Sequence, residues 1–176
     1  MRKKRAIRGW LTGALLVGVT GLTVSVAEAR HAKRVFRAPL GGFAEVPSIS
    51  TAGHGRLWLR VSRDEGLIEY KLTYSDMTSA VTQAHIHFGE SRTNGGVAVV
   101  LCQSATAPDP SGLAPMCVAE GTVEGTFTAE QVIGPEAQGI GPGQIRELIR
   151  ALRHRAGYVN VHTERFPAGE IRGQIK

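Results

Sequence analysis

Near the middle of the chain, an eight-residue stretch alternates between apolar and polar side chains. Ala84, Ile86 and Phe88 are apolar, whereas His85 and His87 lie between them. Successive side chains of a β-strand point to opposite faces, so this pattern predicts a strand with one face in a hydrophobic core. The other face then carries two imidazoles, about 6–7 Å apart along the strand. A chain built around such a strand must fold as a sheet that covers a core.

A second stretch near the C-terminus repeats the alternation. Two valines share one face, and Asn160 and His162 lie on the other. If the two strands are neighbours, three histidines line one polar surface. A His-x-His strand with a third histidine from another strand is a recurrent way to hold copper or zinc. The sequence therefore predicts a candidate metal site at His85, His87 and His162. The alternative is that these imidazoles only hydrogen-bond backbone, Thr or Asn groups.

Further polar side chains are candidates for supporting these histidines. Glu170 and Arg172 stand two residues apart on the last predicted strand, so they share a face. A buried pair of this kind would orient a nearby imidazole or loop. Glu45 is another candidate partner, and Asn160 lies on the histidine face of its strand. The alternative for the Glu170–Arg172 pair is a solvated edge-strand contact, which would contribute little to stability.

The chain begins with a segment typical of an exported protein. Five Lys and Arg residues within positions 1–8 precede 19 uncharged residues and a small-x-small sequence at 27–29. This pattern predicts a secretory signal peptide cleaved after Ala29, and hence a secreted or periplasmic protein. The alternative is an uncleaved membrane anchor, because 19 uncharged residues approach the span of a bilayer. A membrane partner is expected only in that case.

The high positive charge of the chain comes mostly from this leader. Removing residues 1–29 takes away five of the 21 Lys and Arg residues and one of the 15 Asp and Glu residues, which leaves a net charge of +2. A nucleic-acid partner therefore has no electrostatic support. The remaining 147 residues can bury about two-thirds of their unfolded surface, as expected of one full domain.

The two cysteines are predicted to form a disulfide. Cys102 and Cys117 both follow the leader, and export places them in an oxidising compartment. The bridge closes a proline-containing loop and stabilises the fold by about 3 kcal/mol in the chain-entropy model. Two cysteines are too few for a structural zinc site of their own.

The spacing of alternating runs and turns predicts an all-β fold. The expected strands are 35–40, 55–61, 67–74, 82–88, 97–101, 118–127, 158–163 and 170–176. Eight short strands with frequent turns are typical of an antiparallel sandwich or barrel. One amphipathic helix is expected at about 143–155, where apolar residues recur with helical spacing. A capping-box pattern at 128–131 predicts a short helical turn.

Several segments of the chain resemble the chordin domain (CHRD) family. They are residues 36–47, the Ala-His-Ile-His-Phe-Gly motif at 84–89, the turn at 94–97, and the sequences at 157–163 and 167–175. The expected organisation is a signal peptide over 1–29, a flexible lead over 30–35 and a CHRD domain over 36–176. The resemblance implies a β fold and export. It implies no reaction, because single-domain exported members share no established activity.

The preferred hypothesis for function is an exported, non-enzymatic binding or matrix module. The chain shows no nucleophile elbow and no glycine-rich phosphate loop before a helix. Its expected partner is an extracellular protein or surface ligand of unknown identity. The alternative hypothesis is a copper- or zinc-binding protein, with the option of redox chemistry, that uses His85, His87 and His162.

Overall fold

The computed structural model describes residues 32–176. The predicted signal peptide at 1–29 and the first two residues of the predicted lead lie outside the described residues. The first strand begins at Val35, the last residue of that lead. Within the described range, no helix is both long and apolar enough to cross a membrane.

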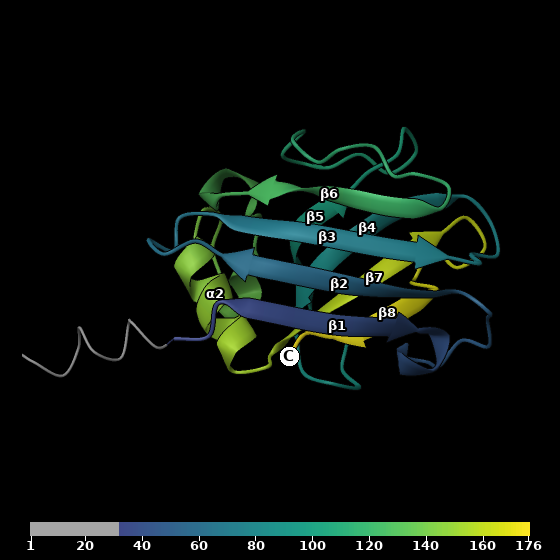
Figure 1. Ribbon diagram of the computed structural model, residues 1–176, viewed down its shortest axis with the longest axis horizontal. Coiled ribbons are helices and arrows are strands. Elements are labelled where there is room, and N and C mark those ends of the chain that lie inside the picture. Colours follow the sequence, from purple (N-terminus) through teal and green to yellow (C-terminus); the bar gives the residue numbers. More distant parts are fainter. Residues whose placement is uncertain (1–31) are drawn as a thin grey trace, which may run out of the picture. The chain divides into compact units, whose positions relative to one another are not determined.

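Eight antiparallel strands form one sheet that curls into a nearly closed barrel, as the sequence predicted (Figure 1). Along the sheet the order is β5-β4-β7-β8-β1-β2-β3-β6. The strands are β1 (Val35–Gly41), β2 (His54–Val61), β3 (Ile68–Ser75), β4 (Val81–Phe88), β5 (Gly96–Cys102), β6 (Gly121–Phe127), β7 (Gly157–Thr163) and β8 (Ile171–Gln174). In Figure 1, β6, β3, β2 and β1 lie in front of the other four.

The core lies inside this curled sheet, where one side chain of every two points inward. Leu57 and Leu59 on β2, Leu72 on β3 and Ile86 on β4 are all fully buried. Burying apolar area in this way contributes about 25 cal/mol per Å² and is the main favourable contribution to folding. The two-residue period of the sequence therefore selects which face of each strand enters the core.

One helix, α2 (Ile145–Arg153), packs its apolar face against the core at one end of the sheet (Figure 1). Leu148, Ile149 and Leu152 are at most 1% exposed, so the predicted apolar stripe is confirmed. The helix is shorter than the expected 143–155. Gly143 has a φ of +81°, which is left-handed backbone that a helix cannot include.

Three short 3₁₀ turns complete the fold within residues 32–176. They are η1 (Gly42–Ala44), η2 (Ala129–Gln131) and η3 (Glu136–Gln138). The turn at η2 is the predicted capping box: Thr128 is its N-cap, and the Gln131 side chain accepts a hydrogen bond from the Thr128 backbone N–H at 3.0 Å. The polar groups at the start of this turn are thus satisfied locally.

The β4–β7 pairing determines the position of the candidate site. Although the two strands are far apart in the sequence, they are direct neighbours, with His85 opposite Asn160 and His87 opposite Tyr158. Gln83 is opposite His162, after an irregularity in the register between residues 81 and 83. The condition on which the three-histidine prediction rested is therefore met.

The predicted disulfide forms between Cys102 and Cys117, next to β5 and β6, the two edge strands of the sheet. Cys102 ends β5, and Cys117 lies four residues before β6 begins. The Tyr70 hydroxyl on β3 also donates to the backbone carbonyl of Leu101 on β5, at 2.8 Å. The disulfide and the Tyr70 hydrogen bond therefore connect the two sides of the sheet near β5 and β6, the strands at its two ends, which are not paired with each other.

Removing the disulfide should destabilise the protein by about 3 kcal/mol, because it frees a loop with a sequence separation of 15 in the unfolded chain. We expect a Cys102→Ala/Cys117→Ala double variant to unfold at a correspondingly lower urea concentration. A reductant should shift the wild type by a similar amount and leave the double variant unchanged. A wild type with the same midpoint in oxidising and reducing buffer would contradict this expectation.

Candidate metal centre

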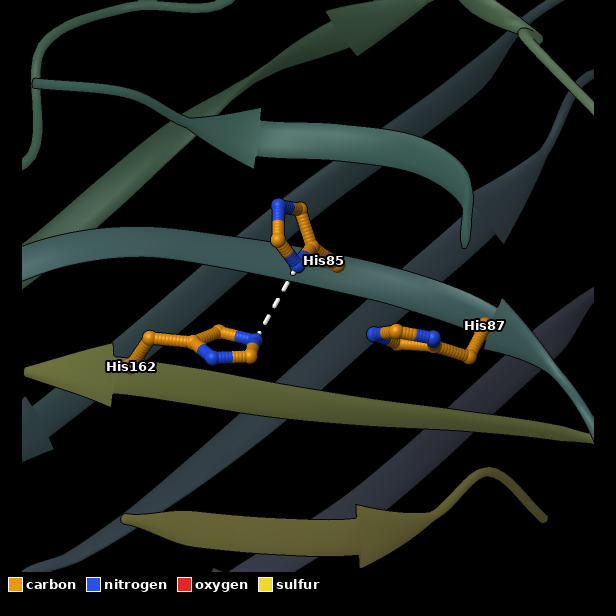
Figure 2. A group of neighbouring side chains, drawn as sticks. All are labelled: His85, His87 and His162. Atoms are coloured by element: carbon orange, nitrogen blue, oxygen red, sulfur yellow. Dashed lines mark hydrogen bonds between the residues drawn. The ribbon is translucent and has the colours of Figure 1, made fainter. Parts of the chain in front are cut away.

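Three imidazoles converge on the β4–β7 pair, as Figure 2 shows. His85 and His87 extend from β4, and His162 extends from β7 toward them. His85 Nδ1 lies 3.1 Å from His162 Nε2. One ring nitrogen from each of the three residues lies within 4.8 Å of the other two. The structure thus brings together the three histidines that the sequence singled out.

Backbone carbonyls fix the tautomers of two of these rings. His87 Nδ1 lies 2.9 Å from the carbonyl oxygen of Gly95, and His162 Nδ1 lies 2.9 Å from that of Pro167. A carbonyl oxygen can only accept, so each Nδ1 carries the proton and donates. In a neutral ring the Nε2 atom then bears a lone pair. The loops after β4 and β7 thereby direct two lone pairs into the cluster.

Burial keeps the rings neutral. It lowers the pKa of His85 to about 3, with the neighbouring His162 and His87 as smaller causes. Burial likewise lowers the pKa of His87 to about 4, against the opposing effect of its bond to the Gly95 carbonyl. The pKa of His162 is also lowered by burial. At neutral pH the three imidazoles therefore offer lone pairs rather than positive charge.

Asn160 lies between two of the imidazoles. Its Oδ1 atom is 3.0 Å from His87 Nε2 and 3.0 Å from His162 Nε2. The side chain is 4% exposed and comes from the same strand as His162. The sequence placed Asn160 among the supporting residues, and the structure places its oxygen inside the cluster.

Glu45 lies behind Asn160 and is also buried, at 6% exposure. Burial raises the pKa of Glu45 to about 7, although the charge of Arg172 and the amide of Asn160 oppose this shift. Among residues 32–176, its Oε1 atom makes no hydrogen bond of regular geometry. The structure places Glu45, a candidate partner in the sequence, beside Asn160, where both side chains border Gly169.

The predicted pair between Glu170 and Arg172 was wrong. Glu170 is fully buried and accepts hydrogen bonds from the hydroxyl groups of Thr51, Thr78 and Thr163. Arg172 is 2% exposed and donates to the backbone carbonyls of residues 90 and 93. Residue 170 precedes β8, and its carboxylate is satisfied by two loop residues and the last residue of β7 rather than by Arg172. The alternative of a solvated pair was wrong as well.

Tyr158 is a supporting residue that the sequence reasoning did not select. Its ring stacks on His87, with centroids 4.6 Å apart and an interplanar angle of 3°. The Arg172 guanidinium carbon lies 3.3 Å from the centroid of the Tyr158 ring. Arg172 and Tyr158 therefore restrict the orientation of His87. The alternation along β7 could have identified Tyr158, because it places this residue on the same face as Asn160.

The fold and the site define a class: an antiparallel β-barrel module with a buried histidine cluster between two neighbouring strands. The sequence model of the CHRD domain family matches residues 36–175 of this chain. The chain therefore belongs to the CHRD domain family, as its motifs suggested. A search of curated proteins found no match.

Proposed function

We propose that this protein is an exported, non-enzymatic CHRD module that binds one divalent transition-metal ion, copper or zinc, through His85, His87 and His162. The observation that carries the proposal is the convergence of three imidazole nitrogens within 4.8 Å of one another. Imidazole nitrogen is a preferred ligand of both metals. Membership of the CHRD family supports the non-enzymatic module.

The surroundings of the histidines support this role. Histidine ligands of metals usually donate their second ring N–H to a carbonyl or carboxylate, which fixes the ring and raises its basicity. His87 and His162 both do so, through Gly95 and Pro167. The lowered pKa values of His85 and His87 favour metal binding further, because few protons compete for their nitrogens at neutral pH.

The predicted leader supports a secreted or periplasmic location, where the module meets metal ions and extracellular partners. Copper is favoured over zinc on affinity alone, since divalent copper heads the series for nitrogen ligands. We also propose that the module binds a second partner, which is an extracellular protein or a surface ligand.

The test is metal content and affinity of the purified protein after chelation and reloading. We expect one equivalent of copper or zinc per chain, and at least about 100-fold weaker binding for His87→Ala, given that even supporting residues contribute 10- to 100-fold. His54→Ala is the matched control, because that histidine is exposed and lies on β2, outside the cluster. Equal affinities of the two variants, or no stoichiometric metal in the wild type, would overturn the proposal.

A further inference from the structure

We propose that Asn160 supplies the fourth ligand of this site through its Oδ1 atom, so that the metal is enclosed by three nitrogens and one oxygen. This inference rests on the proposed function and goes beyond it. It makes the site four-coordinate and closed, and it selects divalent ions over monovalent copper.

The first argument is electrostatic. His87 and His162 each donate through Nδ1 to a backbone carbonyl, so their Nε2 atoms are acceptors. The Asn160 oxygen, also an acceptor, lies 3.0 Å from both. The Asn160 oxygen therefore faces two acceptor nitrogens at hydrogen-bond distance. Such acceptors repel one another unless a cation or a donor lies among them. His85 can donate through Nδ1 to His162 Nε2, but this leaves His87 Nε2 and the Asn160 oxygen facing each other without a proton.

The second argument concerns the orientation of the Asn160 amide. Turning the amide would direct its NH₂ group at the imidazoles and remove the conflict. Its oxygen would then face Glu45. In the observed orientation Nδ2, and not Oδ1, borders the Glu45 carboxylate, whereas the turned amide would bring two oxygen acceptors together there.

Gly169 brings the two groups together. A Cβ atom at this position would lie 2.5 Å from Glu45 Oε1 and 2.9 Å from Asn160 Nδ2, so both atoms border the same space. Gly169 also has a φ of +125°, which other residues rarely adopt. Glycine here lets the Glu45 carboxylate approach the NH₂ side of the amide and leaves Oδ1 directed at the histidines.

The third argument is distance. Bonds of about 2.0–2.1 Å to a tetrahedral zinc place neighbouring ligand atoms about 3.3 Å apart. The Asn160 oxygen is 3.0 Å from two of the nitrogens, and the His85–His162 nitrogen pair is 3.1 Å apart. These three distances lie within a few tenths of an ångström of tetrahedral edges, whereas the widest nitrogen–nitrogen separation in the cluster, up to 4.8 Å, has to shorten by more than about 1 Å when a metal binds.

This ligand set has two chemical consequences. An amide oxygen is a hard donor that suits divalent copper or zinc and contributes little to monovalent copper, which prefers soft ligands. Four protein ligands also fill a tetrahedral zinc site, which distinguishes closed structural sites from catalytic ones. Such a closed site agrees with the non-enzymatic role proposed above.

The experiment uses the full chain loaded with Co²⁺ in place of zinc and titrated with azide, followed by the visible d–d absorption of the metal. The spectrum of the wild type should not change with azide, whereas that of Asn160→Ala should, because its fourth position is open. The same variant should bind divalent copper or zinc about 10-fold or more weakly. Its affinity for monovalent copper, measured against a competing chelator, should be unchanged.

Two further variants keep the test decisive. Asn160→Asp retains the shape and the oxygen, so it should exclude azide and bind divalent metal at least as tightly as the wild type, even if the alanine variant fails to fold. Gln83→Ala removes another amide from β4, one that bonds Ala107, and should behave as wild type. Azide binding by the wild type, with divalent affinity unchanged in Asn160→Ala, would overturn this inference and leave the three-histidine site standing. A wild type that binds no metal would overturn both.

Discussion

Glu170→Ala is expected to lower the free energy of unfolding by about 3–5 kcal/mol, because it leaves the four donors that converge on this buried carboxylate without their acceptor. The Glu170 carboxylate accepts bonds from the hydroxyls of Thr51 and Thr163, at 2.7 Å each, and from the hydroxyl and backbone N–H of Thr78. Burial alone would raise the pKa of Glu170, but these hydrogen bonds outweigh it and lower the pKa. The side chain thus connects two loops and the end of β7 at one point.

Urea unfolding of matched variants measures this effect. Glu170→Gln keeps the shape but loses the charge and exchanges one acceptor for a donor, so its free energy of unfolding should fall between those of the wild type and the alanine variant. Glu124→Ala removes a carboxylate from the exposed face of β6 and should leave the midpoint unchanged. If Glu170→Ala unfolded at the same urea concentration as Glu124→Ala, the assigned role of the Glu170 hydrogen bonds would be wrong.

Most of the correctly predicted fold came from one pattern, the alternation of apolar and polar residues along each strand. The alternation of β4 and β7 correctly predicted that Ile86 and Val159 enter the core while His85 and Asn160 share the other face. Local patterns also indicated the helix, the capping box and the disulfide. Each of these features depends on residues within one segment or on a single possible pairing, as with two cysteines.

The surroundings of the site could not be predicted in the same way. His85 and His87 are only 7% and 8% exposed, although the pattern placed them on a polar face that could equally have met solvent. Their burial depends on loops, and two of the three threonines that bind Glu170, Thr51 and Thr78, also lie in loops. The carbonyls of Gly95 and Pro167 carry no side-chain signal at all. Such contacts depend on loop conformation, which has no sequence period.

The buried histidines also predict how stability depends on pH. Acidifying the metal-free protein from pH 7 to pH 4.5 should lower its free energy of unfolding by roughly 2 kcal/mol or more. The pKa values of His85 and His87 are about 3 and 4 in the fold, against 6.5 for an unperturbed histidine. Below pH 6.5 the unfolded chain therefore binds more protons, and stability falls with pH. Glu45 has the opposite effect, because its pKa of about 7 exceeds the ordinary glutamate value of 4.5.

Chelator-treated protein, unfolded in urea at steps between pH 7.5 and 4.5, measures this dependence. Glu45→Gln removes the opposing group, so the loss on acidification should become larger, whereas His54→Ala should leave the profile unchanged. Bound metal competes with the protons and should preserve the stability to lower pH. A free energy of unfolding that stays constant or rises as the pH falls would contradict the burial of neutral imidazoles. That result would also remove the reason to expect metal binding under mildly acidic conditions.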